Sequence, residues 1–362
     1  MRSTVWIFVM GVLLCCCAMD LSAQFRRKIK KPKPSSNFTI EQLAPGVWAA
    51  ISNDYYGKAI CNAGIVDLGD RTLVFDPFLT PSVARELKAF ARYLTKKQVS
   101  FVVNSNYRND HIRGTQVFLP NASVISTSFT RQEIERIEPA EQEWERKHAP
   151  TLLQATKKRM TNASTTEKEE LPLWIGYYQG MVESVDELFT ATPDMIFEDS
   201  LWITGTKLSI KLVERRNGNT ASDAVMLIPS LGIAFMSDLL SNGRHPWISD
   251  GNVDGWQESL KLFYEDTLYH TYVPGHGKVC GKEPLKTLYE YLEDIKTLCK
   301  SATTDSAEIA LMHQPIPQPY RGWFYGRFYQ PNLQFIINSG RQRADENSLK
   351  VREERIPGAR RY

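Results

Sequence analysis

The chain has few cysteines, and their placement excludes a disulfide-stapled fold. Six are present in 362 residues, and three of them are adjacent within an apolar N-terminal run. The other three, Cys61, Cys280 and Cys299, are widely spaced and odd in number, so at most one bridge can form. Three buried thiols without a catalytic role are the interpretation we favour.

Beyond the N-terminus the chain also lacks any uninterrupted apolar run of about 20 residues, the length that crosses a bilayer. The N-terminus itself has Arg2, an apolar run from Val5 to Met19 and small residues before Gln24, which is the pattern of a secretory signal. We therefore expect residues 1–23 to be a signal peptide and the protein to be secreted or periplasmic. Lipidation of one of the adjacent cysteines, anchoring the protein at the envelope, is the alternative.

Neither sign of charge is in large excess, since the formal net charge is +3. Six basic residues lie in the proline-containing arm at 24–37, which we expect to be a solvated linker, so the middle of the chain is acidic. An acidic core is poor for binding nucleic acid and compatible with holding a cation. The composition predicts no nucleic-acid partner.

Short β-rich runs alternate with helical patterns, which predicts an α/β layered fold. Two β-rich halves, each followed by helices, point to two facing sheets with helices outside. The strands are expected at 47–51, 60–68, 72–75, 101–103, 124–127, 201–203, 207–213, 224–228, 233–236 and 271–273, and the helices at 81–93, 256–264 and 283–300.

A charged, helix-forming stretch interrupts this alternation at about 130–195. It predicts an amphipathic helical pair whose glutamates face solvent. Because long insertions between core elements often carry function, a lid over a site is the alternative. The glutamates are Glu133, Glu135, Glu138, Glu141, Glu143 and Glu145.

Two further segments complete the expected organisation. Residues 38–300 would form the main domain, and the aromatic-rich segment 301–340 would pack as a cap. We expect residues 341–362 to be a flexible tail.

Four short segments at strand ends carry the chemistry. They are Asn104–Gly114, Gly218–Thr220, Met236–Leu240 and Pro274–Gly277. A lone histidine or strand-end aspartate has no special meaning, because most are satisfied core residues or turn caps. In this order, each in its own loop, the four segments are more specific.

Their order resembles that of the metallo-β-lactamase superfamily over about residues 38–300. The first segment is similar to the signature His-x-His-x-Asp-His loop, and the others to the later ligand loops. The resemblance implies an αββα four-layer sandwich with a helical insertion and a metal site where the loops of the two sheets meet. It also implies that Asp76, at a strand end, steadies the ligand loop through hydrogen bonds.

The chain departs from the family at the first metal position. Three histidines bind that metal in the family, and here Asn106, Arg108 and Asn219 occupy their places. An amide is a poor zinc ligand, and a guanidinium has no lone pair to offer. We therefore expect no metal at the first position.

The resemblance implies that the second metal position is retained. Its ligands would be Asp110, His111 and His276, with Asp238 as the fourth. This set suits one Zn²⁺, or Fe or Mn. Asp238 either closes the shell as a ligand or turns toward Arg108 and leaves a place for water. The further alternative is a degenerate site with no metal, in which an ion pair with Arg108 neutralises the Asp238 carboxylate.

Two functions follow from these residues. The first is a mononuclear hydrolase of an unidentified ester, thioester or phosphoester. In it Asp110 or Asp238 acts as base and Arg108 orients a small, anionic substrate. The second is an inactive binding protein on a hydrolase scaffold. Neither the substrate nor the oligomeric state follows from the sequence.

Overall fold

The computed structural model describes residues 29–302 and 304–354. The expected signal peptide and the start of the expected linker lie outside these residues, as do the last eight residues of the expected tail. Among the described helices, none combines the length and the apolar character needed to cross a membrane.

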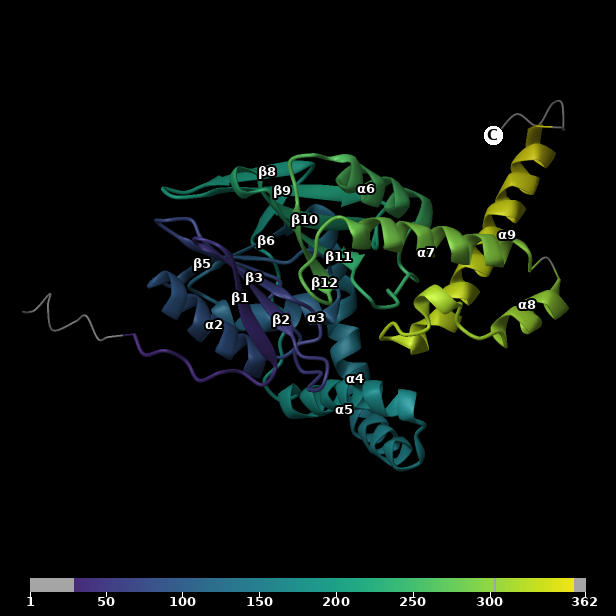
Figure 1. Ribbon diagram of the computed structural model, residues 1–362, viewed down its shortest axis with the longest axis horizontal. Coiled ribbons are helices and arrows are strands. Elements are labelled where there is room, and N and C mark those ends of the chain that lie inside the picture. Colours follow the sequence, from purple (N-terminus) through teal and green to yellow (C-terminus); the bar gives the residue numbers. More distant parts are fainter. Residues whose placement is uncertain (1–28, 303, 355–362) are drawn as a thin grey trace, which may run out of the picture.

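The molecule has two sheets between outer helices, which confirms the αββα sandwich (Figure 1). The first sheet has the order β1-β2-β3-β4-β5-β6-β7, and the second β12-β11-β10-β9-β8. The first-sheet strands are β1 (Phe38–Ala44), β2 (Val47–Ser52), β3 (Ala63–Asp67), β4 (Thr72–Phe75), β5 (Val99–Val103), β6 (Ser123–Thr127) and β7 (Met195–Phe197). The second-sheet strands are β8 (Ser200–Thr204), β9 (Ser209–Arg216), β10 (Ser222–Ile228), β11 (Ile233–Ser241) and β12 (Thr271–His276).

Three apolar clusters correspond to the three interfaces between the layers. Helix α2 (Pro81–Thr95) packs Val83, Ala84 and Leu87 against the outer face of the first sheet. The two sheets face one another through a second cluster that includes Phe75 and Phe235, whose ring centroids are 6.0 Å apart. Helices α6 (Val253–Glu265) and α7 (Glu283–Lys300) cover the second sheet through the third cluster. Burial on both faces explains why the central strands are apolar runs rather than alternating ones.

The sequence missed several elements, among them two strands and two C-terminal helices. Strand β1 alternates polar and apolar residues at the edge of its sheet, and β7 has only three residues. Helices α8 (Asp305–Met312) and α9 (Tyr329–Glu354) follow α7. Helix α9 extends to Glu354, so part of the segment expected as a flexible tail is helical.

The insertion between β6 and β7 is a pair of long helices, α4 (Ser128–Asn162) and α5 (Thr165–Ser184). The expectation that its glutamates face solvent is wrong for two of them. Glu138 and Glu145 are 2% and 8% exposed, and both bind the guanidinium of Arg113, which is 3% exposed. Arg113 follows the short helix α3 (Asn109–Ile112), so this ion cluster ties the insertion to the loop that carries the candidate ligands.

The three remaining cysteines are free thiols. Cys61 and Cys299 are buried, and Cys280 is partly buried. The disulfide that the sequence left open is therefore not formed among them.

Replacing Arg113 by methionine should lower the free energy of unfolding by about 3–5 kcal/mol, because Glu138 and Glu145 would keep their charges in the interior without a cation. Denaturant unfolding measures the change. The matched control is Arg131→Ala, which removes an exposed pair with Glu135 and should cost less than about 1 kcal/mol. Adding Glu138→Gln and Glu145→Gln to Arg113→Met should recover stability. A loss below about 1 kcal/mol for Arg113→Met would contradict this role.

Candidate metal centre

The candidate ligands lie at one edge of the two sheets. Asp110 and His111 occupy α3, which begins after the loop that follows β5. Asp238 lies in β11 and His276 ends β12, and because these two strands are parallel both residues face the same edge. A Cβ atom on Gly275 would lie 2.7 Å from Asp238 Oδ1, so only glycine lets β12 pass this close to the carboxylate.

Four side-chain atoms converge there. His111 Nε2 lies 3.2 Å from Asp238 Oδ1 and 3.5 Å from Asp110 Oδ2. His276 Nε2 lies 3.0 Å from the same Asp238 oxygen and 3.7 Å from the same Asp110 oxygen. Ligand atoms about 2.0–2.1 Å from a tetrahedral zinc ion are separated by about 3.3 Å, so these separations are of the right size.

Two of these atoms lack the hydrogen bonds that buried polar atoms normally make. Within the described residues, His111 Nε2 and Asp238 Oδ1 are buried and have no hydrogen-bond partner. A divalent cation would satisfy both at once. The residues present therefore fit a metal ion, and two imidazoles with two carboxylates suit zinc, iron or manganese.

The orientation of His111 is fixed by Asp76, which follows β4 and is 0% exposed. The Asp76 carboxylate accepts hydrogen bonds from the Ser105 backbone N–H (2.9 Å) and hydroxyl (2.8 Å) and from the Ser237 hydroxyl (3.0 Å). It also accepts from His111 Nδ1 at 2.9 Å. With Nδ1 used in this way, Nε2 is left to face Asp110 and Asp238.

Three carboxylates surround His111, and their negative charge must be balanced by a positive one. Burial favours its neutral ring, but Asp238, Asp110 and Asp76 together raise the pKa of His111 well above its usual range. Burial also opposes ionisation of Asp238, yet His111 and His276 hold the pKa of that carboxyl well below its usual range. A metal ion or a proton can supply the charge, and the ion would leave His111 neutral as a ligand.

The three residues at the first-metal positions gather on the other side of Asp238. Asn106 Nδ2 donates to Asp238 Oδ2 at 3.2 Å, and Arg108 Nε lies 3.9 Å from the same oxygen. Arg108 also donates to the carbonyl of Asn219 at 3.3 Å. One oxygen of Asp238 thus faces the histidines while the other faces Arg108. Ligation through one oxygen of Asp238 and an ion pair with Arg108 through the other are compatible in this geometry.

Sequence reasoning missed Asp250, whose carboxylate lies 3.4 Å from Arg108. Arg108 is therefore shared between Asp238 and Asp250. A lone aspartate in the loop between β11 and α6 has no motif, so only the fold reveals it.

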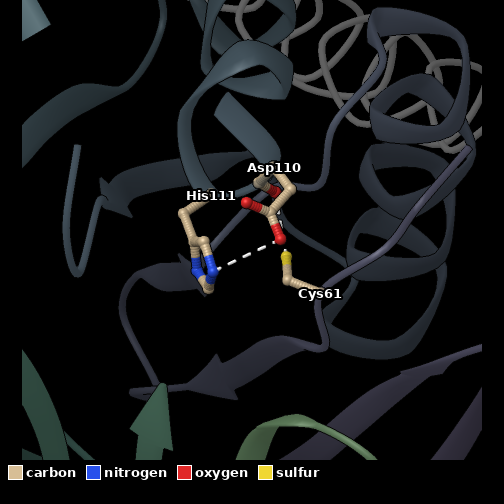
Figure 2. A group of neighbouring side chains, drawn as sticks. All are labelled: Cys61, Asp110 and His111. Atoms are coloured by element: carbon tan, nitrogen blue, oxygen red, sulfur yellow. Dashed lines mark hydrogen bonds and ion pairs between the residues drawn. The ribbon is translucent and has the colours of Figure 1, made fainter. Parts of the chain in front are cut away.

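Cys61 was also missed as a neighbour of the site. Figure 2 shows its sulfur beside Asp110 and His111, and the donor atoms of the three residues lie within 4.8 Å of one another. The thiol donates to the backbone carbonyl of Asp110 at 2.9 Å. Burial and the nearby carboxylates raise the pKa of Cys61 well above its usual range, so it stays protonated and helps to fix the start of α3.

A cavity of about 550 Å³ opens over these residues. Asp110, Asp238, His276 and Arg108 line its base, and Trp174 and Tyr177 of α5 with Tyr325 and Phe328 of the C-terminal segment line its sides. The insertion and the C-terminal segment therefore both take part in enclosing the site.

Comparison with known proteins agrees with this geometry. A family model described as the metallo-β-lactamase superfamily matches residues 56–283, which contain all the candidate ligands. No curated protein matches the sequence.

Solved structures share the fold at low identity. A metallo-β-lactamase from Pontibacter korlensis is 15% identical, with a TM-score of 0.52 over 71% of this chain and 99% of its own. One from Erythrobacter litoralis, with β-mercaptoethanol in the active site, is 17% identical, with a TM-score of 0.50 over 73% and 100%. The FIM-1 enzyme of Pseudomonas aeruginosa in its mono-zinc form is 16% identical, with a TM-score of 0.50 over 74% and 98%.

Substituting Asp76 by asparagine should weaken zinc binding by about 10- to 100-fold, because the charged acceptor that orients His111 is lost. Competition with a chromophoric chelator measures the affinity. Asp67→Asn is the control, since Asp67 is similarly buried but pairs with Lys97 and Lys207, and its affinity should stay unchanged. Wild-type affinity in Asp76→Asn would show that this contact does not tune the metal.

Proposed function

The chain belongs to the metallo-β-lactamase superfamily, and from that premise we propose that it is an exported hydrolase working with one metal ion. Its substrate would be an ester, a thioester or a phosphoester. The observation that carries the proposal is the pair of buried, facing atoms His111 Nε2 and Asp238 Oδ1 without hydrogen-bond partners among the described residues, with His276 Nε2 beside them.

A single ion is proposed because Asn106, Arg108 and Asn219 offer an amide, a guanidinium and an amide where the family has three histidines. The guanidinium of Arg108 lies beside Asp238 and Asp250 and supplies positive charge there without binding metal. Asp110, His111, Asp238 and His276 would hold the one ion, zinc or alternatively iron or manganese. When bound, such an ion lowers the pKa of water and polarises a carbonyl or phosphoryl oxygen.

The chain's own residues would do the rest of the work. Asp238 or Asp110 would take the proton from the attacking water, since both carboxylates border the cavity and the histidines. Arg108, also on the cavity wall, would orient a polar or anionic group of a small-molecule substrate. Asp76 would keep His111 aimed at the ion.

Export is the second part of the proposal. It rests on the signal pattern at residues 1–23.

The test is chelator-sensitive hydrolysis by the zinc-loaded protein of 4-nitrophenyl acetate, S-phenyl thioacetate and bis(4-nitrophenyl) phosphate. One of them should be turned over, and chelation should abolish the activity. Asp238→Asn and His276→Ala should each lower kcat/KM by about 100-fold or more. His313→Ala, which changes an exposed histidine far along the chain, serves as the control and should match wild type.

Turnover that survives chelation, or that His276→Ala leaves intact, would contradict the proposal. Zinc binding with no hydrolysis of any ester class would instead favour the second candidate, a binding protein on this scaffold. The convergence of four side-chain atoms supports that candidate, because four protein ligands would leave no coordination place for water.

A further inference from the structure

The cavity above the metal centre is lined with aromatic side chains. Seven of them come from four separate parts of the chain: Tyr107, Trp174, Tyr177, Tyr178, Trp247, Tyr325 and Phe328. A volume of about 550 Å³ is within the range of small-molecule sites, and aromatic walls hold flat apolar groups.

These walls are held in place before any ligand arrives. The Trp174 ring packs against Tyr325 and Phe328, with centroids 5.7 and 5.6 Å away. The carboxylate of Glu170 accepts hydrogen bonds from Trp174 Nε1 at 2.6 Å and from the Gly326 backbone N–H at 3.1 Å. The insertion helix α5 and the C-terminal segment are thereby fastened to one another over the site.

The insertion also packs closely against a segment of the first half of the chain. The backbone of Gly176 passes so close to the loop before β3 that a Cβ atom there would lie 1.8 Å from the Tyr56 carbonyl oxygen. A pocket with fixed aromatic walls selects for shape, because little ordering of side chains is needed on binding.

The charged side chains on the cavity wall limit the charge that a substrate can carry. Arg108 and Arg327 are positive, and Asp110, Asp238 and Asp250 are negative. Burial raises the pKa of Glu141 to about 7, so this carboxyl is only partly ionised near neutral pH. Arg108 is already paired with Asp238 and Asp250, and Arg327 lies over the Trp174 ring at 4.4 Å. The wall alone is therefore net negative, and one divalent ion brings it to between neutral and a single positive charge. Such a site balances at most one negative charge of a substrate.

From these walls and charges we propose that the substrate carries a flat aromatic ring beside its scissile bond and at most one negative charge. The inference rests on the proposed hydrolase and narrows its substrate class. With a carboxylic ester as substrate, the water oxygen bonds to the acyl carbon and the acyl carbon–oxygen bond of the ester breaks. One water proton ends on the leaving alcohol, and the carboxylic acid product releases the other proton to solvent.

The test compares benzyl acetate with cyclohexylmethyl acetate, which share the acyl group and similar size but differ in ring flatness, and with 4-(acetoxymethyl)phenyl phosphate, which adds negative charge. Acetate release by the zinc-loaded full chain is followed. The kcat/KM for benzyl acetate should exceed that for the cyclohexylmethyl ester at least threefold and that for the phosphate at least tenfold. Equal rates for the three esters would overturn the inference while leaving the hydrolase intact.

Variants of Trp174 then separate ring recognition from folding. Trp174→Phe should retain the preference for benzyl acetate and Trp174→Leu should lose it, although both shorten the side chain. Trp202→Leu, at an exposed tryptophan of β8, is the control and should retain the wild-type preference. An unchanged preference in Trp174→Leu would overturn the assignment of the ring site to this wall.

A binding measurement separates this inference from the proposed function. Isothermal titration of the zinc-loaded protein with N-benzylacetamide and N-(cyclohexylmethyl)acetamide, which resist hydrolysis, should show tighter binding of the aromatic amide. Preferential binding without turnover of any ester would support the ring site and overturn the hydrolase. Equal binding of the two amides would overturn the ring site.

Discussion

The buried carboxylate of Asp76 is the constraint on which the site depends. It accepts hydrogen bonds from Ser105, His111 and Ser237, which come from the loop after β5, from α3 and from β11. One side chain therefore joins the edges of both sheets and sets the direction of a ligand. Asp76 and Ser237 have positive φ angles of 52° and 48°, which are costly for residues other than glycine. Strain at both positions is understandable where the backbone must turn two polar side chains toward one point.

On the proposed assignment, Arg108 explains how a centre that binds two cations in the family would keep one here. Loss of three histidines would leave Asp238 facing an uncharged, polar region, and buried carboxylates need a positive partner. Asn106 and Arg108 both lie against Asp238 Oδ2, and Asp250 in turn holds Arg108. The other oxygen of Asp238 remains directed at the two histidines. In this arrangement, one oxygen of Asp238 pairs with Arg108, and the other stays available to a metal ion at the second position.

The sequence predicted the sandwich and identified the candidate ligand loops, because both can be recognised from local patterns. Apolar runs indicate strands that are buried on two faces. The order of Asp110, Asp238 and His276 can be read directly from the sequence and compared with the order of ligands in the family. What it missed depends on contacts between distant segments. Glu138 and Glu145 lie in a stretch whose composition is typical of a solvated helix, but both are buried because they pair with the buried guanidinium of Arg113. Likewise, only the folded chain brings Asp250 to Arg108, Cys61 to Asp110, and the C-terminal Phe328 to Trp174 of α5.

The claim that one metal ion is held, and only one, is tested most directly by native mass spectrometry of residues 24–362 titrated with zinc. Wild type should bind a single ion, and Asp110→Ala and His276→Ala should each lose it. A second ion should appear when histidine replaces Asn106, Arg108 and Asn219 together. Two ions in wild type, or a single ion that survives both alanine variants, would contradict a single metal position formed by these residues.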